Sequence, residues 1–148
     1  MAKQGIQLVY GGGNKGIMGA VANGVLDSGG QVIGIIPQLL IDWEQAHPGL
    51  TDLRVVADMH VRKKIMYELC DAAIVLPGGF GTLDELFEML TWNSLKIHDK
   101  QIYILDTNKF YSPLIKHMHK MYEEEFLYST VENRITVIHE PSQLMNYL

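Results

Sequence analysis

The sequence predicts an α/β fold, a Rossmann-like parallel sheet with helices on both faces. Short apolar runs alternate along the chain with segments of helical periodicity, and two of the runs break directly into glycine-rich turns at 11–16 and 77–81. A strand, a glycine turn, a helix and a second strand form a βαβ unit, whose right-handed crossover gives parallel strands. The 148 residues predict a single domain, 1–148, large enough to bury a core.

Each element follows from a local pattern. Strands are expected at 6–10, 31–36, 53–57, 72–76, 101–105 and 134–138, which are short runs rich in apolar residues. Helices are expected between the glycines at 16 and 29, and at 60–71, 83–96 and 112–125, with a short final helix after Pro141. Ser112 and Pro113 are expected to cap and open the helix at 112–125. Residues 37–52, which contain Pro37, Pro48 and Gly49, are predicted to form a loop.

Composition excludes several classes of function. The formal charge of -5 argues against nonspecific binding of nucleic acid, which requires clustered Lys and Arg. No apolar run is long enough to span a membrane, so a cytoplasmic protein is expected. The single cysteine, Cys70, excludes an internal disulfide and a cysteine-based zinc site. The histidines lack ligand spacing, and we predict no metal and no cofactor.

The turn at 77–82, Pro-Gly-Gly-Phe-Gly-Thr, has the character of a phosphate seat. A strand that breaks at proline, crosses glycines and enters a helix presents free backbone N–H groups at the positive end of that helix. Thr82 stands where an N-cap is expected, and Glu85 follows three residues later. This spacing fits a capping box. It also fits a glutamate that contacts a ligand part beyond the phosphate, and the spacing alone leaves both readings open.

The first glycine turn gives a weaker signal. Gly11, Gly13 and Gly16 match the dinucleotide fingerprint, but the second strand ends at Pro37 without the acidic residue that would hold a ribose hydroxyl. A phosphate-binding Walker loop is also excluded, because Ile17 and Met18 occupy the positions of its lysine and its serine or threonine.

Arg62 lies within an apolar sector of its predicted helix, while Lys63 and Lys64 project away from the centre of that sector. The apolar residues of the sector are Val61, Ile65, Met66 and Leu69. A buried arginine needs a partner, which a carboxylate or a phosphate would supply. A structural ion pair or a snorkelling side chain are the alternatives. Glu44 belongs to the loop where such sheets place ligand contacts, although an exposed loop glutamate is often only solvated.

Several segments together resemble one family. The segments 8–19, 44–51, 59–63, 77–85 and 91–100 occur in the right order and cover essentially the whole chain. They are similar to the LONELY GUY proteins, the cytokinin riboside 5′-monophosphate phosphoribohydrolases that are often mislabelled as lysine decarboxylases. The decarboxylase label has no support in the residues, because no segment resembles a pyridoxal phosphate lysine site.

The resemblance implies a homodimer that hydrolyses the N-glycosidic bond of adenosine 5′-monophosphates, often N6-substituted, to the free base and ribose 5-phosphate. It implies that Arg62 and Glu85 are required for activity, that the glycine turn holds the phosphate and that Glu44 contacts the substrate. Residues 92–100 are a plausible dimer contact. The expected substrate-binding residues are Glu44, Lys63, Gly78, Gly79, Phe80, Gly81, Thr82, Asp84, Gly12 and Met18.

The family has a further strand and helix before the point that matches Met1, so we expect a sheet without them. Either the gene model starts at an internal methionine, or the protein is genuinely shortened and closes the gap by rearrangement or with a partner segment. Two other functions stay open: a nucleotide or molybdenum-cofactor carrier of the same fold, and an inactive truncated relative. The pair Arg62 and Glu85 discriminates against a carrier, which needs only the glycine seat.

Overall fold

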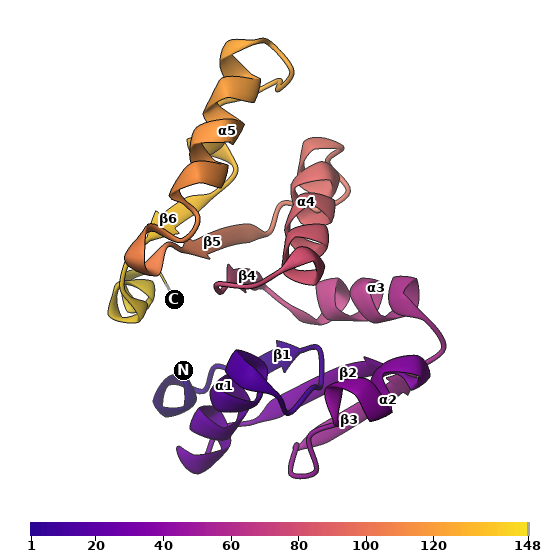
Figure 1. Ribbon diagram of the computed structural model, residues 1–148. Helices are drawn as coiled ribbons and strands as arrows, with labels where there is room; N and C mark the ends of the chain where they lie inside the picture. Colours follow the sequence, from indigo (N-terminus) through magenta and orange to yellow (C-terminus); the bar gives the residue numbers. More distant parts are fainter. Residues whose placement is uncertain (148) are drawn as a thin grey trace. The chain divides into compact units, whose positions relative to one another are not determined.

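The computed structural model describes residues 1–147, apart from the side chains of Asp42 and Glu44. It contains two compact units, Met1–Cys70 and the residues from Asp71 onward. Each unit has a three-stranded sheet in which every pairing is parallel (Figure 1). The predicted α/β class, parallel strands flanked by helices, is therefore confirmed.

The sheet of the first unit has the order β1-β2-β3. Its strands are β1 (Leu8–Tyr10), β2 (Val32–Pro37) and β3 (Asp52–Val56). The central strand β2 is buried along its whole length, as expected of a strand with a neighbour on each side and a helix over each face. Its run of apolar residues, rather than an alternating pattern, reflects this position.

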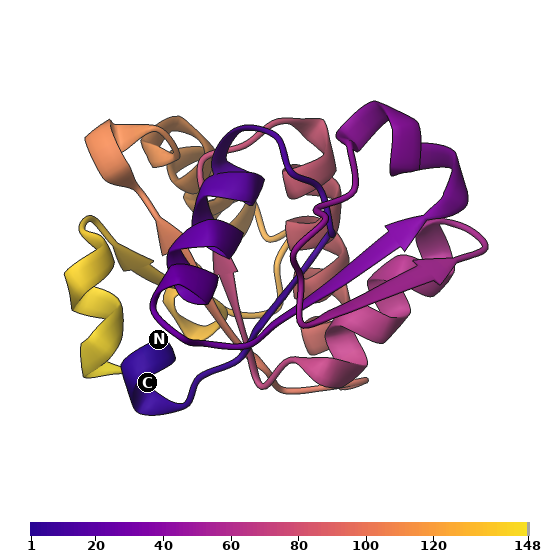
Figure 2. The same cartoon turned by 90° about the horizontal axis from the view of Figure 1, so that it is seen from below.

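Two helices flank this sheet. Helix α1 (Gly16–Asp27) follows the first glycine turn, and α3 (Met59–Leu69) follows β3. Figures 1 and 2 show them on opposite faces of the sheet. The core under α1 is formed by buried side chains of α1 and β2 with partly buried neighbours: Ala22, Val25, Val32, Leu8, Tyr10, Leu26 and Leu50. A short 3-10 helix, η1 (Ala2–Gln4), precedes β1.

The prediction of a loop at 37–52 is wrong in part. The segment contains a 3-10 helix, η2 (Gln38–Leu40), and one turn of α-helix, α2 (Ile41–Glu44). The prolines that suggested a loop stand outside these turns, since Pro37 closes β2 and Pro48 follows α2. The sequence between them is therefore free to form helical turns.

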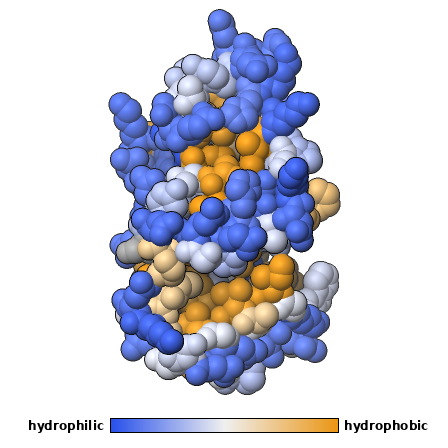
Figure 3. All heavy atoms as spheres, turned by 90° about the vertical axis from the view of Figure 1, so that its left-hand side faces the viewer, coloured by the Kyte–Doolittle hydropathy of each residue, from blue (hydrophilic) through white to orange (hydrophobic). Residues whose placement is uncertain are grey.

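The sheet of the second unit has the order β4-β5-β6. Its strands are β4 (Ala72–Val75), β5 (Gln101–Leu105) and β6 (Thr136–Ile138). Tyr103 and Leu105 are two positions apart in β5 and therefore lie on the same face of the sheet. There they form a core cluster with Ile138, Leu144 and the partly buried Ala72, Ile74 and Leu76. In the space-filling view of Figure 3, hydrophobic atoms remain visible among hydrophilic ones.

Two long helices and three 3-10 helices complete the second unit. They are α4 (Phe80–Ser94), α5 (Ser112–Glu123), η3 (Thr107–Lys109), η4 (Val131–Asn133) and η5 (Pro141–Asn146). The predicted N-cap of α5 is wrong by one residue. Tyr111 occupies the cap position and Ser112 is the first helical residue, because the Ser112 hydroxyl bonds Asp106 instead.

The chemistry-bearing segments follow the strands directly. The glycines at 11–13 follow β1, the turn at 77–79 follows β4, Asp106 follows β5 and His139 follows β6. Each set therefore lies at the carboxyl ends of its own parallel sheet, the edge at which open α/β sheets bind ligands. Among the described residues, no helix has both the length and the apolar character needed to cross a membrane.

Candidate active site

The glycine turn at 77–79 leads into an uncapped helix end. Gly79 is the N-cap of α4 with an extended backbone, φ -96° and ψ -153°, and no side chain of the described residues caps it. The first backbone bond of the helix runs from the Leu83 N–H to the Gly79 carbonyl, 3.1 Å. The amides of residues 79–82 therefore precede the helical ladder, at the place where the sequence predicts an anion seat.

Thr82 is not the N-cap that its spacing suggested, so the capping-box reading with Glu85 is wrong. Helix α4 begins at Phe80, which places Thr82 in its first turn. A Cβ added at Gly78 would lie only 2.9 Å from the Thr82 Cβ. The threonine side chain thus lies against the Gly78 backbone, and this contact accounts for both the glycine and the threonine.

Glu85 lies in the second turn of α4, one turn beyond Gly81 and Thr82 and on their side of the helix. Its side chain is half-buried, whereas the neighbouring Asp84 is exposed. Phe80, at the tip of the turn, leaves 93% of its surface accessible. A carboxylate in this position stands about one helical turn from any anion bound at the helix start.

In the first unit, Arg62 is bound to the first glycine turn. Its side chain is 6% exposed, and its Nη2 donates to the Gly11 carbonyl oxygen at 3.2 Å. A Cβ on residue 11 would approach the Arg62 Cζ to 2.9 Å. Gly11 is therefore required because the guanidinium occupies the space of a side chain at this position. The sequence predicted a buried, partnered arginine, and the burial is confirmed.

The buried face of α3 differs from the predicted one. Its buried residues are Arg62, Lys63 and Tyr67, whereas Val61 and Leu69 are each 37% exposed. Lys63, expected to project away from the apolar sector, is only 7% exposed, while Lys64 is exposed as expected. Long cationic side chains bury their methylene stems readily, and an apolar count on a helical wheel misses this.

The turn at 11–15 is joined to the segment at 43–47 by three hydrogen bonds. The Gly12 carbonyl accepts from the His47 N–H at 2.9 Å, and the Asn14 N–H donates to the Gln45 carbonyl at 3.0 Å. The Lys15 Nζ donates to the Trp43 carbonyl at 2.8 Å. These bonds hold the turn that contains Gly12 against the segment before Pro48 within this unit.

The remaining predicted site residues of the first unit are Met18 and Glu44. Met18 lies in the first turn of α1 and is 36% exposed. Glu44 ends α2, but its side chain lies outside the described residues. Arg62 and Lys63 belong to one unit and Glu85 to the other, so the joint role of Arg62 and Glu85 that the resemblance implies stays a prediction.

Sequence reasoning missed His47, which organises the loop before β3. It is 5% exposed, its Nε2 lies 3.0 Å from the Asn23 Oδ1, and its Nδ1 accepts from the Gly49 N–H at 3.1 Å. Both ring nitrogens are thus engaged, which gives His47 a structural role. Nothing in the local sequence marks it, because its partner Asn23 lies in α1, 24 positions earlier in the chain.

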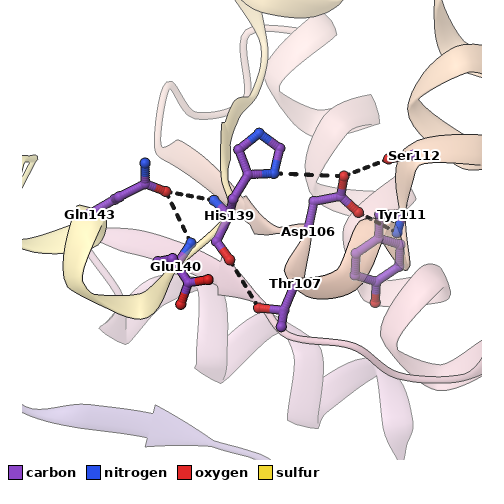
Figure 4. A network of polar contacts seen from close by, with 7 residues as sticks. All are labelled: Asp106, Thr107, Tyr111, Ser112, His139, Glu140 and Gln143. Carbon is purple, nitrogen blue, oxygen red and sulfur yellow. Dashed lines mark hydrogen bonds and ion pairs between the residues drawn. The ribbon is translucent and has the colours of Figure 1, made fainter.

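Sequence reasoning also missed a polar network around the buried Asp106 at the carboxyl ends of β5 and β6 (Figure 4). The Asp106 side chain, 2% exposed, accepts from the Tyr111 N–H at 2.6 Å and from the Ser112 hydroxyl at 2.7 Å. The His139 Nδ1 lies 4.0 Å from its Oδ2. The Thr107 hydroxyl donates to the His139 carbonyl at 3.2 Å. An acidic residue directly after an apolar strand was the available signal.

Tyr111 and His98 of the second unit have perturbed pKa values. Burial raises the pKa of the Tyr111 phenol, and a hydrogen bond from the Gly78 backbone opposes that rise. Burial lowers the pKa of His98, the charge of Lys100 lowers it further and that of Asp99 raises it. Neither group lies in a metal site, since the described residues contain no cluster of three or more His, Cys, Asp or Glu that could hold one.

Comparisons with known proteins give three informative relatives. A cytokinin riboside 5′-monophosphate phosphoribohydrolase of Rhodococcoides fascians is 46% identical over 138 residues, 93% of this chain and 70% of the relative. The Arabidopsis thaliana enzyme of that name, LOG3, is 42% identical over 148 residues, 100% of this chain and 69% of the relative. A probable enzyme of that name from Oryza sativa subsp. japonica, LOGL1, is 44% identical over 127 residues, 86% of this chain and 57% of the relative.

The fold and the glycine turns after β1 and β4 define a Rossmann-like α/β protein. The family model described as "Possible lysine decarboxylase" matches residues 18–148. The chain belongs to this family, that of the LONELY GUY proteins, as the resemblance implied. It spans 57% to 70% of the length of the three relatives.

Proposed function

We propose that this protein hydrolyses the N-glycosidic bond of adenosine 5′-monophosphates, often N6-substituted, and releases the free base and ribose 5-phosphate. The observation that carries the proposal is the uncapped start of α4 after the glycine turn, with Glu85 one turn further along the helix. The names of the relatives, which are phosphoribohydrolases of cytokinin riboside 5′-monophosphates, support the same reaction.

The substrate's phosphate binds at the start of α4. Backbone amides and the positive end of a helix favour a dianion without requiring a cationic side chain. Asp84 and the exposed Phe80 border this seat. From the other unit, Gly12, Met18, Glu44 and Lys63 contribute to substrate binding, with Arg62 on the binding side. This division of roles rests on the family resemblance and on the positions of these residues in their own elements.

Glu85 acts on the sugar. The C1′–N9 bond breaks, positive charge develops on the ribose ring and water supplies the hydroxyl group at C1′, while its proton is delivered to the departing base. A carboxylate near the ring stabilises the oxocarbenium-like transition state or directs the water to C1′. The phosphate seat holds the ribose within reach of this carboxylate, which converts the reaction into one between prepositioned groups.

We propose further that the protein is a cytoplasmic homodimer that needs no cofactor. The segment at 92–100 supports a dimer contact, because Leu95 and Ile97 leave 65% and 62% of their surfaces exposed. Large apolar side chains of this exposure, close in sequence, favour an interface. Sedimentation of the purified protein tests the assembly, and Leu95→Asp together with Ile97→Asp should shift a dimer to monomer.

The reaction is tested by incubating the protein with AMP and separating adenine and ribose 5-phosphate by chromatography. Glu85→Gln should release no detectable adenine, while Glu124→Gln should behave as the parent, because Glu124 is an exposed residue at the end of α5 that pairs with Lys120. Binding of AMP by folded protein without any adenine would instead favour a nucleotide carrier.

A further inference from the structure

The phenol of Tyr111 contacts the start of the glycine turn at 77–79. The Tyr111 hydroxyl donates to the Leu76 carbonyl at 2.7 Å, and the Gly78 backbone lowers the pKa of the same phenol against the effect of burial. The phenol is therefore bonded to the residue before Pro77. Since proline has no N–H, the turn offers few other bonds with which to fix its path.

Tyr111 is itself held rigidly. Its side chain is 2% exposed, and its ring meets that of Phe110 edge to face with centroids 4.8 Å apart. Its backbone N–H donates to the buried Asp106 carboxylate, which also accepts from Ser112. The loop after β5 thus fixes the tyrosine, and the tyrosine fixes the turn after β4, within the same unit.

The amides that can serve an anion follow the residue that Tyr111 holds, which is Leu76. The amides of residues 79–82 precede the first helical bond, at Leu83, and face no capping side chain of the described residues. Those four amides are the ones available to an anion.

We propose that Tyr111 is a positioning residue for the substrate's phosphate: it clamps the start of the turn at Leu76 so that the amides of residues 79–82 converge on one phosphate. The inference rests on the proposed function for its substrate, and Asp106 supports it by fixing Tyr111. Gly78, expected from the family resemblance to bind substrate, is then part of the clamped turn, and its N–H is not one of the four that bind the phosphate.

The test is Tyr111→Phe, which keeps the ring and removes only the hydroxyl. Loss of one net hydrogen bond that preorganises the turn should weaken binding of inorganic phosphate and of ribose 5-phosphate by about threefold to tenfold. The KM for AMP should rise by a similar factor, with kcat changed less. The matched controls are Tyr103→Phe and Tyr128→Phe. Tyr103 is a buried tyrosine of β5 and Tyr128 is fully exposed, so both variants should bind phosphate as the parent does.

An effect on folding alone is separated by two readouts. Thermal melting measures stability, and a Tyr111→Phe protein that melts earlier but binds phosphate with the parent affinity overturns the proposal. In the parent, amide NMR during a phosphate titration should shift residues 79–82 more than Gly78. A dominant shift at Gly78 also overturns it, and this measurement needs no variant.

The inference and the proposed function fail separately. Phosphate binding that depends on Tyr111 without any adenine release from AMP would refute the hydrolase and leave the clamp in place. Adenine release with phosphate binding unaffected by Tyr111→Phe would refute the clamp and leave the hydrolase in place.

Discussion

The Nη2 of Arg62 donates to the Gly11 carbonyl at 3.2 Å, and the guanidinium fills the space that a side chain on residue 11 would occupy. The two residues stand 51 positions apart, yet neither can change without affecting the other. Gly11→Ala should therefore displace Arg62, destabilise the fold by about 1–3 kcal/mol through overpacking and lower the rate of AMP hydrolysis by about a hundredfold. Urea denaturation and adenine release measure the two effects.

The matched control is Gly24→Ala. Gly24 lies within α1, and a Cβ there meets no atom within 4 Å. Within a helix, alanine is more stable than glycine by about 0.5–1 kcal/mol, so this variant should be more stable and equally active. Full activity of Gly11→Ala would show that the position of Arg62 does not matter for turnover.

The buried Asp106 should contribute strongly to stability. Asp106→Asn preserves the shape but cannot accept at both oxygens, so the bond from the Tyr111 N–H or from the Ser112 hydroxyl is weakened. We expect a loss of about 1–3 kcal/mol in the free energy of unfolding, measured by urea denaturation. Asp52→Asn is the control, because the Asp52–Arg54 pair is exposed and should contribute less than about 1 kcal/mol. Equal losses for both variants would contradict this account of Asp106.

His98 should make the fold sensitive to mild acid. Burial, its largest cause, lowers the pKa of His98 below 6.5, so the unfolded chain takes up a proton at a higher pH than the folded one. The stability associated with neutral His98 is complete above pH 6.5 and falls as the pH drops from there through the folded pKa. His98→Asn should reduce this loss, since its side-chain oxygen can replace the Nδ1 that accepts from the Lys100 N–H.

Trp92 offers a direct readout of this titration. Its ring centroid lies 6.0 Å from that of His98 at an interplanar angle of 75°, so protonation of the imidazole should quench its fluorescence. Trp43→Phe leaves Trp92 as the only tryptophan. The quenching midpoint should lie below pH 6.5 and disappear in His98→Asn, whereas His117→Asn, on the exposed side of α5, should leave it unchanged. A midpoint at or above 6.5 would contradict the direction of the shift.

The sequence was sufficient where the information is local. Apolar runs and turn residues identified all six strands of the described residues, because the alternation of a strand and the turn residues that end it are adjacent in sequence. The start of α4 was misplaced, because Thr82 offered the better cap by residue type while Gly79 occupies the cap position in space. A glycine N-cap has no side chain and so leaves a weak signal.

Contacts across the sequence were beyond local patterns. The bond between Arg62 and Gly11, and the one between Tyr111 and Leu76, join residues 51 and 35 positions apart. Each pair is brought together by the parallel sheet of its own unit. Residue types alone predicted that Arg62 would need a partner, but only the path of the backbone identifies Gly11 as one.

The division of roles at the proposed site is tested by Glu85→Ala. The ground-state ribose carries no positive charge, so the carboxylate interacts more strongly with the oxocarbenium-like transition state than with bound AMP. A carboxylate about one helical turn from the phosphate seat also repels the phosphate. Removal of Glu85 should therefore lower kcat by at least about a hundredfold and leave the Kd for AMP the same or slightly lower. Adenine release gives kcat, and calorimetry of the inactive variant gives Kd.

Glu124→Ala, which removes an equal charge from the exposed end of α5, controls for net charge and should change neither quantity. The informative outcome is the combination of the two measurements on Glu85→Ala. If affinity for AMP collapses together with turnover, Glu85 binds the substrate in its ground state, and the carboxylate that stabilises the developing charge on the sugar must be another residue.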